Sequence, residues 1–218
     1  MMTAEPHRHA RFSRYDLIGD PNPIWSVRRH GRCHQRGECG KGRRCSTVET
    51  PQVKGAIVEV IDGPRLEYRV SRPTLGIRKR TPFRGMLAER DRLLAELIDW
   101  MPAHDVEPVD SFYLRLHTVD MAGEMDIEVG AFATAPGDEK VVRGAMPGGE
   151  YVVLRYINHS MRAHRLLFEW AEAEQIRFDV EEADAGTDWA GRFEIYVTDP
   201  RTEPRKTRWE TELAFLTR

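Results

Sequence analysis

The feature that most constrains the fold of this chain is a strand–turn–strand pattern that occurs twice in 218 residues. The later copy, Arg192–Pro200, alternates apolar and polar residues and leads through a proline-marked turn to another strand at Arg205–Thr217. The earlier copy, Leu114–Asp120, shows the same alternation ahead of a second run at Asp126–Ala133. An internal duplication of this kind predicts two similar units that pack as a pair.

A period of two assigns the side chains of Arg192–Pro200 to two opposite faces of a strand. Its apolar residues are expected to pack against a core, and Glu194 and Tyr196 are expected to face a cleft. In the earlier copy, Arg115 and His117 hold the matching positions. The pattern therefore predicts that these four polar side chains share the sheet face that points away from the helices.

Each half of the chain also carries one amphipathic segment. Apolar residues recur at intervals of three and four over 81–101, and Pro82 fits the first turn of that helix. A second helix is expected over about 158–175. The predicted fold is α+β: strand–helix–strand–strand units at about 56–135 and 138–218 form a pseudo-two-fold antiparallel sheet with a central ligand cleft.

The first 55 residues differ in character from the domain expected over 56–218. Residues 1–50 contain ten Lys or Arg and five Asp or Glu, a net charge of +5, which leaves −7 for the remainder of a chain whose total is −2. Without sustained apolar periodicity, this basic segment is expected to be disordered. It also lacks two amphipathic helices for a helix-turn-helix, and an acidic domain repels phosphate, so direct DNA binding is not expected.

The cysteines raise the alternative of a zinc site. Cys33, Cys39 and Cys45 all lie in the basic segment, close to His30 and His34. Thiolates and imidazoles are the usual zinc ligands, yet cysteines spaced six apart form no ligand pair, so a solvated tail is the preferred interpretation and no metal or cofactor is predicted. The sequence has no apolar run of membrane-spanning length and no signal-peptide pattern, which predicts a cytoplasmic protein without a membrane partner.

Several short motifs follow one another in a specific order from about Leu66 onward. They are Asp-Ile-Glu-Val-Gly at 126–130, Pro-Gly-Gly-Glu-Tyr at 147–151 and Phe-Glu-Ile-Tyr at 193–196. Together they resemble the GyrI-like, or effector-binding, family, which includes the gyrase inhibitory protein and the drug-sensing domains of bacterial transcription activators. The resemblance implies two strand–helix–strand–strand units around a cleft that holds a deep carboxylate. Glu194 falls on the motif position of that carboxylate, whereas a strand glutamate without this resemblance would be taken as solvent-exposed.

The expected ligand site is a carboxylate surrounded by polar and aromatic side chains, namely Glu194, Tyr196, Arg115, His117, Tyr113, Tyr151 and Trp170. Such a site would attract a hydrophobic compound with a cationic or amine group. If Arg115 paired with Glu194, a neutral or zwitterionic ligand would be favoured instead.

Three functions are compatible with these residues. A stand-alone small-molecule-binding protein is preferred, because the chain has no nucleophile elbow, nucleotide loop or zinc-protease helix. The resemblance implies a second possibility, a hydrolase that opens the cyclopropane rings of toxic natural products through Glu194 as the catalytic residue. A third is an inhibitor that acts on a protein partner, as the gyrase inhibitory protein does.

Overall fold

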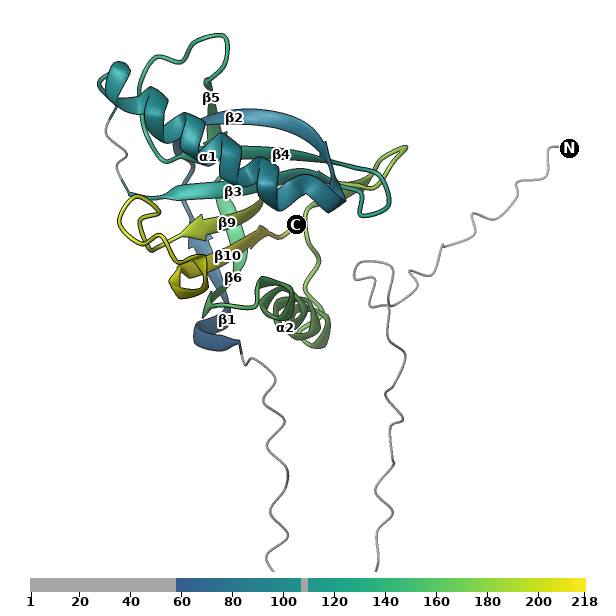
Figure 1. Ribbon diagram of the computed structural model, residues 1–218. Helices are drawn as coiled ribbons and strands as arrows, with labels where there is room; N and C mark the ends of the chain where they lie inside the picture. Colours follow the sequence, from purple (N-terminus) through teal and green to yellow (C-terminus); the bar gives the residue numbers. More distant parts are fainter. Residues whose placement is uncertain (1–57, 107–109) are drawn as a thin grey trace, which may run out of the picture. The chain divides into compact units, whose positions relative to one another are not determined.

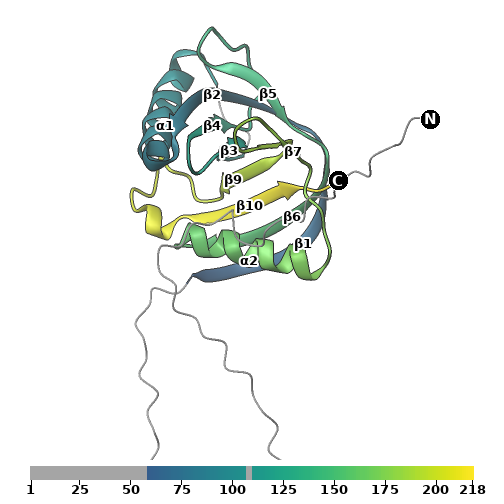
Figure 2. The ribbon, with the colours of Figure 1, turned by 90° about the vertical axis from the view of Figure 1, so that its right-hand side faces the viewer.

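The computed structural model describes residues 58–106 and 110–218. In this part of the chain, two α-helices accompany a ten-stranded antiparallel sheet that curls into a half-barrel (Figures 1 and 2). The expectations for the basic segment, including Cys33, Cys39, Cys45 and the zinc alternative, lie outside the described residues.

The elements alternate along the chain in the order that the duplication predicts. The longer ones are β1 (Glu59–Arg69), β2 (Arg72–Pro82), α1 (Met86–Ala103), β3 (Phe112–Val119), β4 (Glu124–Ala131), β5 (Val142–Met146), β6 (Gly149–Ile157), α2 (Ser160–Ala173), β9 (Arg192–Tyr196) and β10 (Glu210–Leu216). Two short strands, β7 (Val180–Glu182) and β8 (Thr187–Trp189), and two 3-10 turns, Phe83–Gly85 and Lys206–Arg208, complete the described chain.

The strand order confirms the two-unit arrangement. The sheet runs β1-β6-β10-β9-β3-β4-β2-β5, so the unit β2–α1–β3–β4 meets the unit β6–α2–β9–β10 where β3 pairs with β9. On each side of the β3–β9 contact, equivalent strands follow in the same order: β9, β10 and β6 on one side, and β3, β4 and β2 on the other. The fold is therefore α+β with a pseudo-two-fold relation between the units, as the sequence predicts.

The first helix begins later than predicted. Thr81 and Pro82 still belong to β2, where they pair with Met125 and Glu124 of β4, and a 3-10 turn separates them from Met86. Pro82 ends strand β2 because the proline ring, which suits the first turn of a helix, is also tolerated at the end of a strand. The apolar stripe of α1 is nevertheless buried as expected.

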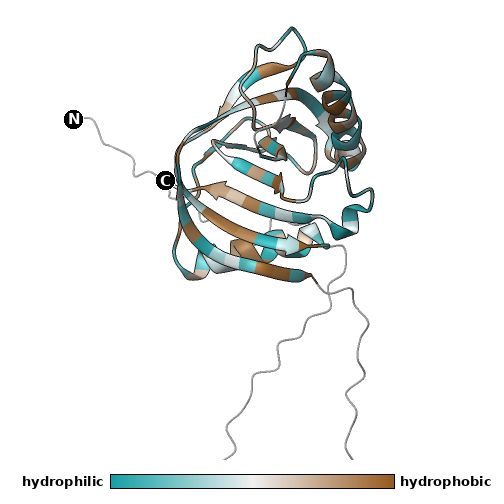
Figure 3. Cartoon of the chain, turned by 90° about the vertical axis from the view of Figure 1, so that its left-hand side faces the viewer, coloured by the Kyte–Doolittle hydropathy of each residue, from teal (hydrophilic) through white to brown (hydrophobic). Residues whose placement is uncertain are grey.

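Both faces of the sheet are covered, but by different parts of the molecule. On the helix face, α1 packs on β2 and β4, and α2 packs on β6 and β1. On the inner face, Met146 of β5 joins one apolar cluster with Tyr151 and Val153 of β6, although β5 and β6 lie near opposite ends of the strand order. The sheet therefore curls around its inner face, and apolar residues alternate with polar ones along its strands (Figure 3).

Among residues 58–106 and 110–218, no helix is long and apolar enough to cross a membrane.

Candidate functional site

Strand β9 carries the predicted carboxylate and is buried along its whole length, with each of its five residues at most 8% exposed. Its register decides which way the side chains point. Glu194 is opposite Leu114 of β3, and Phe193 is opposite Arg115. Residues directly opposite in an antiparallel pair share a face, and Leu114 belongs to the core beneath the helices. Glu194 therefore lies on the helix face, and Phe193 on the inner face.

The expectation that Glu194 and Tyr196 face away from the helices is thus wrong, whereas Arg115 and His117 do lie on the inner face. Alternation along β9 separates two faces but cannot tell which one meets the helices when both are buried. Phe193 serves the inner core, and the polar residues of β9 obtain their partners from the helices. We call Arg192, Glu194 and Tyr196, which share the helix face, the polar row of β9.

Glu194 contacts His164 of α2 and interacts electrostatically with Arg90 of α1. His164 of α2 places Nε2 3.3 Å from Glu194 Oε1. Burial lowers the pKa of His164, and Glu194 only partly opposes this. Arg90 of α1 is itself mostly buried, and although burial disfavours its charge, Tyr196, Asp91 and Glu194 together raise its pKa. The carboxylate therefore lies between a neutral imidazole and a fixed guanidinium.

Arg192 lies at the other end of the polar row, among aromatic rings. Its guanidinium carbon lies 4.7 Å from the ring centroid of Trp189 and 4.9 Å from that of Phe215. Burial lowers the pKa of Arg192 to about 10, and the nearby Glu194 limits the decrease. Cation–π contacts of this kind contribute up to about 2 kcal/mol when they are desolvated. Arg192 thus remains a cation at neutral pH.

Arg192 Nε is buried and has no hydrogen-bond partner within the described residues, and the Tyr196 hydroxyl has no partner there apart from the neighbouring Arg90 guanidinium. Burial is also the main reason why the pKa of Tyr196 is raised, so its hydroxyl keeps its proton. Buried polar groups are normally hydrogen-bonded. Arg192 Nε is therefore an unsatisfied polar atom next to Glu194, whereas the Tyr196 hydroxyl is held beside Arg90.

A second buried carboxylate, Glu128, lies on the inner face, and sequence reasoning did not select it. The Tyr113 hydroxyl donates a short hydrogen bond to Glu128 Oε1, and His117 Nε2 lies 2.8 Å from Oε2. Burial alone would raise the pKa of Glu128, but His117 and Tyr113 outweigh it and the pKa is lowered. We call Glu128, Tyr113 and His117 the Glu128 cluster.

Two glycines make room for the Glu128 cluster. Gly76 and Gly130 are opposite each other in the ladder between β2 and β4. A Cβ atom on Gly76 would lie 2.7 Å from Glu128 Oε1, and one on Gly130 would overlap the Tyr113 hydroxyl. The sequence signal that could have identified this cluster is the motif at 126–130, in which the acid Glu128 stands two residues before Gly130.

The remaining predicted site residues have separate environments. Arg115 donates to the carbonyl oxygens of Ala145 and Ala190, at 3.2 and 2.9 Å, so the pairing with Glu194 that would have favoured a neutral or zwitterionic ligand does not form. Tyr151 donates its hydroxyl to the Pro147 carbonyl at 2.7 Å, and burial raises its pKa to about 12. Trp170 lies on α2 and packs against the core beneath the helices.

The seven predicted residues therefore do not form one site. Four of them, Tyr113, Arg115, His117 and Tyr151, lie on the inner face, while Glu194 and Tyr196 lie on the helix face and Trp170 on α2. Within the described ranges, no group of three or more His, Cys, Asp or Glu side chains is placed to hold a metal ion.

Comparison with known proteins relates this geometry to solved structures. No family model and no curated protein matches the sequence. The C-terminal domain of EcmrR superposes with a TM-score of 0.51 and 14% identity, over 71% of this chain and 96% of that one. EcmrR in its DNA complex superposes with a TM-score of 0.51 and 13% identity, over 73% of this chain and 57% of that one. SAV2435 bound to tetraphenylphosphonium superposes with a TM-score of 0.47 and 12% identity, over 71% of this chain and 93% of that one.

At such low identity these comparisons concern the fold. The described chain, in which two units pair through β3 and β9 and each places one helix on the same sheet face, shares its fold with the C-terminal domain of EcmrR.

Proposed function

We propose that this chain is a small-molecule-binding protein that holds a hydrophobic ligand with a cationic or amine group against the polar row of β9. The observation that carries the proposal is the buried Glu194 carboxylate, flanked by the unpartnered Arg192 Nε and by the Tyr196 hydroxyl beside Arg90. The effector-binding fold supports it, because the sequence motif of that fold's cleft carboxylate falls on Glu194.

The cationic group of the ligand would take over the role that Arg90 now plays. Arg90 comes from the neighbouring helix and interacts electrostatically with both Glu194 and Tyr196. A ligand that displaces this guanidinium meets the same carboxylate and an aromatic wall, where the Tyr196 and Trp209 rings lie 5.1 Å apart. Burial between helix and sheet excludes water, which strengthens both the ionic and the cation–π contact.

A hydrolase acting through Glu194 is the second candidate, favoured by the contact between Glu194 and His164. A carboxylate and an imidazole 3.3 Å apart can pass a proton between a water molecule and a leaving group. In such an enzyme, Glu194 would act mainly in the transition state. Its loss would then abolish turnover and leave substrate binding nearly intact.

The test is a titration of the full chain with ethidium, an aromatic cation, followed by dye fluorescence. Glu194→Gln should weaken binding by about 1–3 kcal/mol, the cost of losing a charge-assisted contact. Glu169→Gln on the exposed side of α2 is the matched control and should bind as the wild type does. Equal affinity in wild type and a folded Glu194→Gln variant would refute the proposal and leave the protein-inhibitor function.

The same variants distinguish the second candidate. Incubation with a cyclopropane-bearing alkylator, followed by mass spectrometry, reports any ring-opened product. A hydrolase would form that product in wild type and lose it in Glu194→Gln, whereas a binding protein forms none in either.

A further inference from the structure

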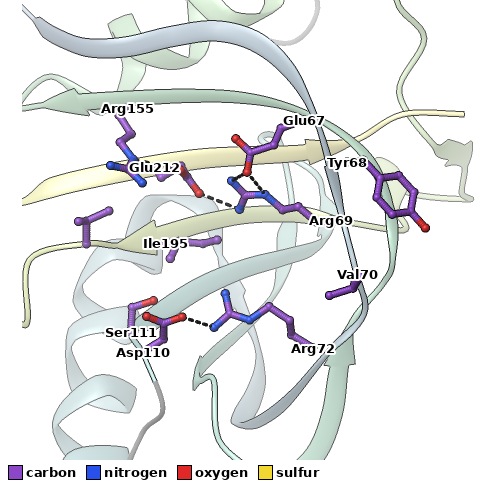
Figure 4. A pocket seen from close by; sticks show the side chains of 11 residues that line it. Glu67, Tyr68, Arg69, Val70, Arg72, Asp110, Ser111, Arg155, Ile195 and Glu212 are labelled. Atoms are coloured by element: carbon purple, nitrogen blue, oxygen red, sulfur yellow. Dashed lines mark hydrogen bonds and ion pairs between the residues drawn. The ribbon is translucent and has the colours of Figure 1, made fainter.

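An open pocket of about 470 Å³ lies on the inner side of the sheet, away from the polar row of β9 (Figure 4). The end of β1, the end of β9 and the segment that leads into β3 line it. Its volume falls within the range of known small-molecule sites, about 300–1,000 Å³. Ile195 lines the pocket and belongs to the inner face of β9, so this pocket and Glu194 lie on opposite sides of the same strand.

Alternating charges form the floor of the pocket. Glu212 accepts from Arg69 Nη1 at 2.7 Å through one carboxylate oxygen and from Arg155 Nε at 3.1 Å through the other. Arg69 also binds Glu67, at 2.9 Å. Burial alone would lower the pKa of Arg69, but Glu212 and Glu67 outweigh it and raise the pKa. Arg69 therefore stays ionised across the physiological pH range.

A further ion pair lies on the other side of the pocket. Arg72 donates to Asp110 at 2.7 Å (Figure 4). The Arg72 guanidinium carbon also lies 3.9 Å from the ring centroid of Phe132. With this pair included, three arginines and three acids line the pocket. The lining carries no net charge, so it offers a simple anion or a simple cation as much repulsion as attraction.

Exposed apolar side chains gather at the same pocket. Val70 and Val197, which line the pocket, are 69% and 42% exposed, whereas the ring of Tyr68 points away from the charged groups (Figure 4). Large apolar groups left in water beside a hollow are typical of a binding surface. They provide a wall for an apolar body next to groups of both charges.

We infer that this pocket binds an amphipathic zwitterion. The negative group of the ligand would lie against Arg155 or Arg72, whose side chains are 39% and 29% exposed, and its positive group against Glu67 or Asp110. Its apolar part would cover Val70 and Val197. A ligand that carries both charges gains from both signs of the lining at once, which a singly charged ligand cannot do.

Dansyl compounds test this inference because they share one fluorescent body and differ in charge. The full chain is titrated with the zwitterion Nε-dansyl-lysine, the cation dansylcadaverine, the anion dansylglycine and the neutral dansylamide. Wild type should bind the zwitterion at least about tenfold more tightly than each of the other three. Equal affinities for all four compounds, or no binding of the zwitterion, would overturn the inference.

Two variants locate the binding. Val70→Ala combined with Val197→Ala removes exposed apolar groups from the pocket wall and should weaken zwitterion binding about fivefold to tenfold, and Arg155→Gln should do the same. Leu87→Ala, which truncates an exposed apolar residue of α1 outside the pocket, is the matched control and should have no effect. A Leu87→Ala variant that loses as much affinity as the double valine variant would overturn the assignment.

Glu194→Gln separates this inference from the proposed function. It should leave Nε-dansyl-lysine binding unchanged whether or not ethidium binding depends on Glu194. Loss of zwitterion binding in Glu194→Gln together with normal binding in the double variant Val70→Ala, Val197→Ala would place the ligand at the polar row of β9 and refute the pocket.

Discussion

Replacing Gly130 by alanine tests whether the sheet is built around the Glu128 cluster. The new Cβ atom would overlap the Tyr113 hydroxyl and lie 2.6 Å from the Leu75 carbonyl oxygen, a backbone atom held in the β2–β4 ladder. The Tyr113 ring has little room to withdraw, because the rings of Phe132 and Phe193 lie 5.2 and 5.5 Å away. The alanine must therefore push strands apart or break the Tyr113–Glu128 hydrogen bond.

The cost of this substitution follows from those two contacts. Overpacking a core costs about 1–3 kcal/mol, and losing a hydrogen bond to a charged group costs about 1.5–3 kcal/mol. Alanine makes the unfolded chain less flexible than glycine does, and this offsets the loss of stability by about 0.4–1 kcal/mol. We expect Gly130→Ala to lower the free energy of unfolding by roughly 2–5 kcal/mol, the sum of these terms.

Urea denaturation followed by tryptophan fluorescence measures this change. Gly85→Ala is the matched control, because its Cβ would meet only Thr81 Oγ1, at 3.9 Å, and its stability should change by less than about 0.5 kcal/mol. Adding Tyr113→Phe to Gly130→Ala removes the overlapping hydroxyl, so the double variant should lose less than the sum of the single changes. A loss below about 1 kcal/mol in Gly130→Ala would refute the reasoning.

Three other outcomes concern pH and chain length. Because burial lowers the pKa of His164, the unfolded chain binds the proton more tightly, and the free energy of unfolding should fall as the pH drops below 6.5. The variant His164→Gln should remove this pH dependence, and the control variant His104→Gln, at an exposed histidine, should keep it. Because the pKa of Glu128 is lowered, its ionised carboxylate stabilises the fold above pH 4.5, and this contribution should disappear as the pH falls through the lowered pKa. Urea denaturation at a series of acidic pH values measures this, and a Glu128→Gln variant whose free energy of unfolding falls with pH as steeply as that of the wild type would contradict it. A chain that begins at Gly55 should melt at the temperature of the full chain, and calorimetry showing a drop of several degrees would count against that expectation.

Local sequence patterns were sufficient for the element types and their order. Alternation with a period of two identified the strand pairs, and spacing of three and four identified both helices, because each pattern reflects the geometry of one element alone. The duplication then predicted two units, and these meet at the β3–β9 contact. Pro82 misplaced the start of α1, since its fixed φ suits both the end of a strand and a first helical turn.

Tertiary structure alone decided which face of each strand meets which partner. The alternation in β9 is real, but the helices bury one face and the curl of the sheet buries the other, so the pattern could not show that Glu194 points toward α2. For the same reason, Arg115 and Glu194, which the sequence placed together, lie on opposite faces. Glu128 gained its partners from β3, and the pocket beside Tyr68 formed between strands far apart in the chain, because contacts between distant segments depend on how the sheet closes and not on any local pattern.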